Sequence, residues 1–265
     1  MEFLLILLSS LLTLISPVGL VVDRTAENAI RSQFAKVQQL QVRVDSVPTH
    51  QLLQGKLKRV RVAGRELQLK HHNLRISALE LETDAIDVDL SSIGRKKLKL
   101  QRPLQTGVRL VLNQQEVTQA LNSQQVTAKL LNLGRSNLDS SKKYNIVKPK
   151  IEFLTNNRVR FRGELTQSNL KPLAITVELG LKVVSGRQLQ IIAPVVLADG
   201  EEVPKQIVNA IATNFTQRLD LGSLDSYGLQ ARILQLKITP EKLEIAAFVS
   251  VEPSSRLLEI AFAPM

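Results

Sequence analysis

Alternation of apolar and polar residues recurs along most of the chain, and this feature limits its fold most strongly. Val60 and Val62 alternate with arginines, and Leu67 and Leu69 continue the pattern after an Ala-Gly-Arg turn or bulge. Residues two apart share one face of a strand, so this period predicts strands with one apolar and one solvent-facing side. The same pattern covers residues 74–90, 107–113, 150–154, 158–165, 173–184, 187–197 and 231–253.

Turn and cap residues divide these strands and predict three helices between them. Asn156-Asn157 and Thr239-Pro240 predict hairpin turns. A first amphipathic helix is expected over residues 23–40, with Ala29, Ile30, Phe34 and Val37 on one face. Asn113 and Glu116 form the pattern of a capping box for a second helix, and residues 201–219 predict a third, with Pro204 in its first turn. Long strands with few helices predict an α+β fold built on antiparallel sheet.

The first 22 residues differ from the rest of the chain. Residues 3–22 carry no charge, and about 20 apolar residues suffice for a helix to cross a bilayer. A secretory signal would begin with positive charge, whereas the early charge here is Glu2. We therefore expect residues 1–22 to form a hydrophobic helix that is a membrane anchor or an uncleaved signal. Residues 23–265 are expected to form one domain, with a mobile loop at about 133–145.

Charge and composition favour some function classes and exclude others. Lys and Arg number 35 against 24 Asp and Glu, so the chain carries a formal charge of +11, which favours anionic partners. No cysteine is present, the three histidines lack metal-ligand spacing, and no nucleotide or hydrolase motif occurs. Aromatic residues make up 3%, without Trp, which disfavours stacking on nucleic acid. We predict a non-catalytic protein without metal or cofactor.

Four segments resemble a known family. Residues 23–34, 52–67, 79–90 and 107–123 are similar to the LmeA-like family of phospholipid-binding proteins, particularly its cyanobacterial members. The resemblance implies an anchored or exported envelope protein, expected at the plasma membrane with its periplasmic side favoured. It also implies a long curved antiparallel sheet that wraps around a few amphipathic helices, similar to tubular lipid-binding domains, and encloses an apolar groove.

These expectations define candidate residues for binding anionic phospholipid or a membrane surface. Apolar strand positions are the candidates for the lipid groove: Val60, Val62, Leu67, Leu69, Leu79, Leu81, Val108, Leu110, Phe153 and Phe161. Basic positions are the candidates for the headgroup: Arg95, Lys96, Lys97, Arg158 and Arg160. The predicted function is membrane-tethered phospholipid binding, with lipid transfer as one form of it. The alternative is a structural or assembly protein at the membrane with an envelope protein partner, whose strands pack into a filled core.

Overall fold

The structure is a computed structural model. It describes residues 27–28, 30–32, 34–45, 54–70, 74–89, 99–123, 126, 144–167 and 171–255. The expected anchor at 1–22, most of the expected loop at 133–145 and the candidates Arg95, Lys96 and Lys97 lie outside these residues. Within the described ranges, no helix is both long and apolar enough to cross a membrane.

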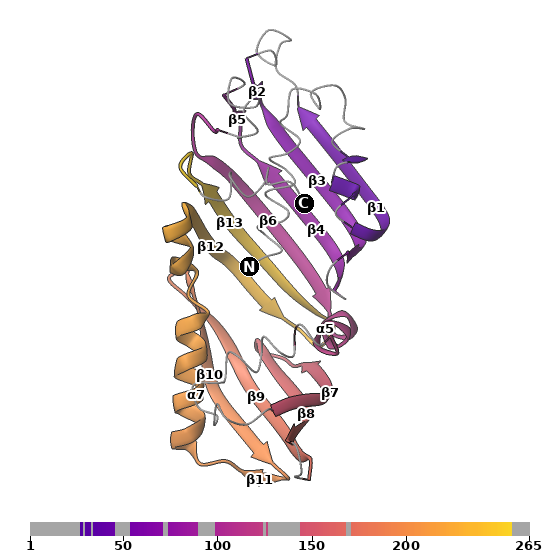
Figure 1. The fold of residues 1–265 in the computed structure, drawn as a ribbon, viewed down its shortest axis with the longest axis vertical. Coiled ribbons are helices and arrows are strands. Elements are labelled where there is room, and N and C mark those ends of the chain that lie inside the picture. The colour runs from indigo at the N-terminus through magenta and orange to yellow at the C-terminus, as the bar shows by residue number, and fades with distance from the viewer. Residues whose placement is uncertain are drawn as a thin grey trace.

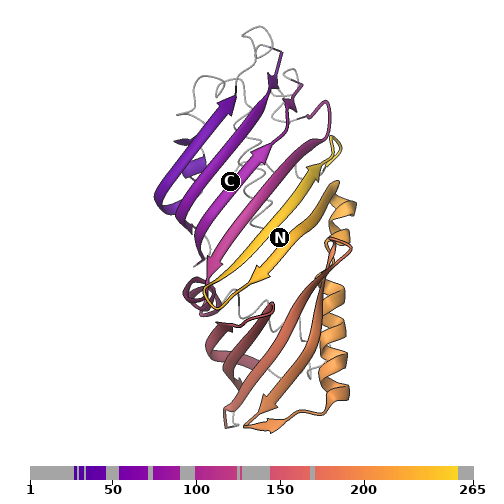
Figure 2. The ribbon, with the colours of Figure 1, turned by 180° about the vertical axis from the view of Figure 1, so that it is seen from behind.

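Two antiparallel sheets lie end to end in an elongated molecule (Figure 1, Figure 2). The six-stranded sheet contains, in spatial order, β1 (Phe34–Asp45), β3 (Arg59–Leu69), β4 (Arg75–Thr83), β6 (Leu104–Asn113), β13 (Lys242–Val251) and β12 (Leu229–Ile238). The five-stranded sheet contains β11 (Glu201–Glu202), β10 (Gln188–Ala198), β9 (Leu173–Val184), β8 (Arg158–Gln167) and β7 (Tyr144–Phe153). A short pair joins β2 (Lys56–Leu57) to β5 (Ile86–Asp87). Mostly antiparallel sheet with few helices confirms the predicted α+β class.

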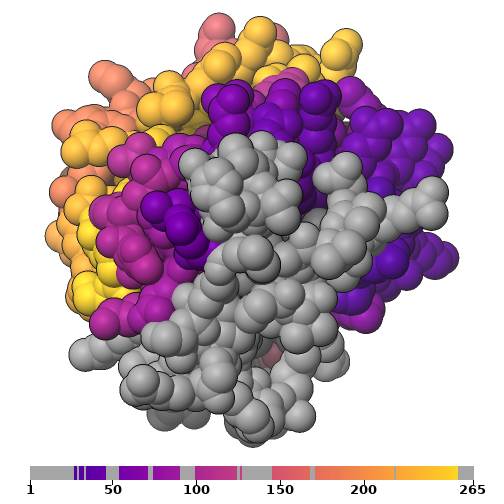
Figure 3. Space-filling view, turned by 90° about the horizontal axis from the view of Figure 1, so that it is seen from above, coloured from indigo at the N-terminus to yellow at the C-terminus, as the bar shows by residue number. Residues whose placement is uncertain are grey.

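The chain builds the six-stranded sheet from both of its ends. After β6 it forms the five-stranded sheet, and it then returns as β12 and β13, with β13 pairing against β6. Seen end-on, the N-terminal strands and the C-terminal strands therefore lie on opposite sides (Figure 3). The five-stranded sheet is thus a long insertion between two neighbouring strands of the other sheet.

Apolar residues form rows across the six-stranded sheet. One such row crosses all six strands through paired positions: Val42, Val62, Leu81, Val108, Ala247 and Ile233. All six are buried, as the alternation along each strand predicts. Burial of aliphatic side chains at about 25 cal/mol per Å² makes this face the main source of stability.

The first strand corrects the expected first helix. Residues 27, 28, 30 and 31 are helical, but Phe34 and Val37 lie in β1 instead of continuing a helix. They pair with Leu69 and Leu67 of β3. Apolar and polar residues alternate along β1 through Leu40 and beyond, so pairing with β3 buries more apolar surface than a short helix could. Residues 34–40 therefore form a strand despite their local helical spacing.

The helix α5 (Gln114–Leu121) begins where the capping-box pattern predicts. The Asn113 side chain accepts a hydrogen bond from the Glu116 backbone N–H at 2.8 Å, and Glu116 Oε2 accepts one from the Asn113 N–H at 2.8 Å. Ser77 Oγ on β4 also donates to this carboxylate, at 2.8 Å. These bonds fix the start of α5 at the end of β6.

Side chains of α5 cover the outer edge of β7. Thr118 Oγ1 accepts from the Ile151 N–H at 3.3 Å, and Gln114 Oε1 accepts from the Phe153 N–H at 2.9 Å. An unpaired strand edge leaves donors without partners and invites pairing with other chains. The helix thus closes one side of the five-stranded sheet.

The helix α7 (Lys205–Arg218) covers the opposite edge, along β10 (Figure 1). Thr216 Oγ1 accepts from the Ile191 N–H at 3.2 Å, and the Leu219 carbonyl accepts from the Leu189 N–H at 3.3 Å. The helix starts later than expected, because Glu201 and its neighbour pair with β10 as β11. Both α5 and α7 lie along sheet edges, whereas the resemblance implied a sheet wrapped around its helices.

Two turns of the five-stranded sheet bond to the free edge of β12. Asn157, in the β7–β8 turn, accepts from the Ile238 N–H through Oδ1 at 2.8 Å and donates through Nδ2 to the Leu236 carbonyl at 3.4 Å. Gly186, in the β9–β10 turn, accepts from the Ile233 N–H at 2.6 Å. The short 3-10 helix η3 (Leu221–Tyr227) then leads the chain back into β12. These bonds join the two sheets.

Replacing Asn157 should weaken this junction measurably. Asn156 and Asn157 have φ values of 57° and 56°, so alanine meets a similar backbone penalty at either position. We expect N157A to lose about 1–3 kcal/mol more unfolding free energy than N156A, because it leaves two β12 groups without partners. Urea unfolding of both variants measures the difference; equal losses would show that the side-chain bonds contribute nothing.

Candidate functional site

The apolar face of the six-stranded sheet holds most of the expected groove residues. Seven of them are buried in one core cluster: Val60, Val62, Leu67, Leu69, Leu79, Leu81 and Val108. Leu110 packs against this cluster. Leu67 and Leu79 have no exposed surface. In this structure these side chains pack against other apolar residues, as those of a protein core do.

The apolar face of the five-stranded sheet is far less covered. A row of paired residues crosses it from Ile151 through Phe161 and Val177 to Val196, and each of these four side chains is only half-buried. The neighbouring pair Leu165 and Leu173 is also accessible, with Leu173 36% exposed. Phe153, at the α5 side, is the buried exception among the expected groove residues of this sheet. We call the face formed by these rows the open apolar face.

The helix α7 adds apolar surface along the side of this sheet. Val208 is buried, and Ile211 and Phe215 are half-buried. Ile207, near the start of the helix, is 52% exposed. The chain buries the apolar face of its six-stranded sheet but leaves aliphatic side chains partly exposed here, and exposed apolar surface of this kind is typical of a binding surface.

The opposite face of the five-stranded sheet carries Arg158 and Arg160, two of the expected headgroup residues. They alternate with Val159 and Phe161 along β8, so their side chains point away from the open apolar face. Both pair with Glu178 on β9, Arg158 at 3.0 Å and Arg160 at 2.7 Å.

This ion-pair network extends to β7. Arg160 and Arg162 contact Glu152 at 3.3 and 2.6 Å. The hydrogen bonds from Arg160, followed by that from Arg158, hold the pKa of Glu178 below its ordinary value, against the opposing effect of desolvation. The same bond to Glu178 raises the pKa of Arg160. A lipid phosphate would have to displace these carboxylates, so the network serves first to tie three strands together.

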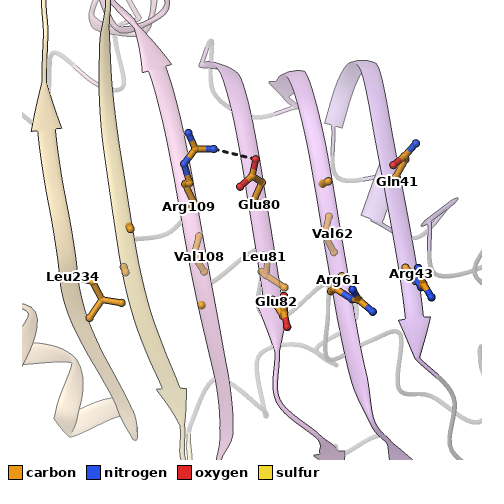
Figure 4. Close-up of a pocket in the computed structure, with 14 residues that line it drawn as sticks. Gln41, Arg43, Arg61, Val62, Glu80, Leu81, Glu82, Val108, Arg109 and Leu234 are labelled. Carbon is orange, nitrogen blue, oxygen red and sulfur yellow. Dashed lines mark hydrogen bonds and ion pairs between the residues drawn. The ribbon is translucent and has the colours of Figure 1, made fainter.

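A shallow depression lies on the polar face of the six-stranded sheet, with a volume of about 520 Å³ (Figure 4). Small residues form its floor, including Ala63, Gly107 and Ala246, and Leu234 stands at its side, 68% exposed. The charged groups around it are paired: Arg109, for example, contacts Glu80 at 3.0 Å, and Arg61 contacts Asp45. Among the described residues, no group of three His, Asp or Glu side chains is placed to hold a metal.

The sequence matches one family model over residues 14–248, which is most of the chain. The chain belongs to the LmeA-like phospholipid-binding family. The resemblance read from four short segments is thereby confirmed. Membership in the LmeA-like family supports lipid binding as the general function. No curated protein and no solved structure matches the chain.

Several residues of the open apolar face were absent from the candidates chosen by sequence. Val177, Leu179 and Val196 are examples, although their alternation was visible. Their period is the same as that of Val62 and its neighbours, so the alternation does not predict which sheet has the uncovered apolar face. That difference arises from tertiary packing around each sheet.

The ion pairs on the other face predict how stability depends on pH. Because the pKa of Glu178 is lowered in the fold, its charge stabilises the protein above its ordinary pKa of 4.5, and this contribution is lost as pH falls through the folded value. We expect E178Q to show a smaller loss of unfolding free energy than wild type between pH 6 and pH 3. Glu201 is exposed and has no ion pair within the described residues, so E201Q is the matched control and should follow wild type. An E178Q profile parallel to wild type would contradict the assignment.

Proposed function

We propose that this protein binds phospholipid by laying acyl chains on the open apolar face of the five-stranded sheet, beside α7. The observation that carries the proposal is the contrast between the two sheets. The apolar rows of one are buried, whereas Phe161, Val177 and Val196 of the other are only partly buried. Membership in a phospholipid-binding family supports the same function.

The residue types suit acyl chains. Branched aliphatic side chains and few rings present a surface on which flexible chains can lie without a fixed shape. Each methylene moved out of water contributes about 0.8 kcal/mol, so a two-chain lipid can bind without specific chemistry. Because the ion-paired face lies on the other side of the sheet, the headgroup would stay in water at the border of the apolar rows.

The expected anchor at residues 1–22 completes the proposal. A tether would keep the domain at the membrane surface, where phospholipid is available, and the surplus of positive charge would favour an anionic leaflet. The protein would act without catalysis at the cell envelope, holding lipid for transfer or display.

Neighbouring positions of β9 allow a sharp test. Val177 lies on the open apolar face, and the adjacent Thr176 points to the opposite face; both are half-buried. We expect V177D to lower the phospholipid bound to the purified full chain at least tenfold, because a carboxylate would meet the acyl chains. T176D should retain lipid near the wild-type level.

The measurement is lipid extraction with native mass spectrometry, accompanied by thermal unfolding of each variant. A wild-type protein that carries no lipid and takes up none from anionic vesicles would reject lipid binding and favour an assembly role. Equal lipid in both folded variants would instead reject this face as the site. If V177D fails to fold, V177T provides the milder change at the same position.

A further inference from the structure

A second depression lies on the polar face of the six-stranded sheet, beside the one shown in Figure 4. Its volume is about 430 Å³, and Arg109 borders both depressions. Buried Ala78 and Val111 form a small apolar floor. The side chains around it are long and polar and come from β1, β3, β4, β6 and β13: Gln38, Gln39, Arg65, Glu66, Ser77, Arg109 and Lys242.

Three cationic side chains border this hollow, and their partners can be followed one by one. Arg109 donates through Nε to Glu244 at 2.7 Å and through Nη1 to Glu80 at 3.0 Å. Lys242 contacts the same Glu244 at 3.0 Å, so two cations share that carboxylate.

The remaining cation is Arg65. Its guanidinium has no carboxylate partner among the described residues, and the carboxylate lining the hollow, Glu66, is occupied by Arg75 at 2.6 Å. The hollow therefore combines the Arg65 guanidinium, which is unpaired within the described ranges, with the Lys242 ammonium group shared with Glu244, an Arg109 nitrogen and two glutamine amides. These are hydrogen-bond donors gathered around a space whose one lining carboxylate, Glu66, is already engaged by Arg75.

We propose that this hollow binds a phosphate group. A guanidinium presents two parallel N–H groups that match phosphate oxygens, and an ammonium adds a point charge without fixed geometry. The phosphate could belong to a soluble phosphate ester or to a lipid headgroup, since both offer the same oxygens. The hollow lies on the polar face of the six-stranded sheet, whereas the open apolar face belongs to the five-stranded sheet. This site therefore stands independently of the proposed function.

Arg65 gives a clean test, because removing it breaks no ion pair within the described residues. Arg232 is an exposed arginine on the polar face of the same sheet, outside the hollow and without an ion pair there, and R232Q is the matched control. Calorimetric titration of the full chain with inorganic phosphate and with glycerol phosphate, at low ionic strength, should give saturable binding. We expect R65Q to weaken it about tenfold or more and R232Q to change it less than twofold.

Vesicles distinguish the two sources of phosphate. If the natural ligand is a headgroup, sedimentation with phosphatidylglycerol vesicles should fall in R65Q and persist in R232Q. If it is soluble, R65Q should lose the phosphate ester and keep the vesicle binding of wild type. The site is rejected if no probe binds saturably, or if R65Q and R232Q weaken every probe equally, which would show only diffuse attraction between charges.

Discussion

Hydrogen bonds at the edges of the sheets join the two sheets to each other and to the helices beside them, and the position of the five-stranded sheet depends on them. A strand edge carries backbone donors and acceptors that must find partners. Side chains of α5 satisfy β7, α7 satisfies β10, and the turns at Asn157 and Gly186 satisfy β12. The five-stranded sheet is thus positioned through its borders. Its apolar face therefore does not have to be fully buried for the sheet to stay in place, and that face is only partly buried.

The two faces of the five-stranded sheet differ in the residues they carry: one holds an ion-pair network and the other holds rows of apolar side chains. On one face, Glu152, Arg160 and Glu178 connect β7, β8 and β9 in a cross-strand network. Pairs with this much solvent exposure each contribute little, but a network of opposite charges on neighbouring strands helps to fix their register. On the other face, aliphatic rows remain accessible. The stabilising pairs and the accessible rows do not compete, because alternation sends them to opposite sides.

Local patterns predicted most of the strands and the start of α5, since alternation and capping act over a few residues. They failed at β1, where the helical spacing of Phe34 and Val37 was overridden by pairing with β3. They also could not distinguish Val62, in the core, from Val177, on the open apolar face, because coverage depends on segments distant in sequence. The sequence shows Arg158 and Arg160 as basic strand residues, but it does not predict their ion-pair partner. That partner, Glu178, is about 20 residues away and becomes a neighbour only when the hairpin forms. The family resemblance supplied what no local pattern could, namely the general class of ligand.

The scarcity of large rings has a consequence for how such a surface discriminates between ligands. A closed pocket contacts its ligand on every side, whereas a partly exposed aliphatic sheet face contacts only the hydrocarbon that lies on it. Phe161 is one of the few rings there, and its partners on the neighbouring strands are the branched aliphatic residues Ile151 and Val177. Nothing in such a lining sorts one headgroup from another. If acyl chains lie on this face as proposed, the length and flexibility of the hydrocarbon would decide the affinity, and the polar end would be free to be bulky.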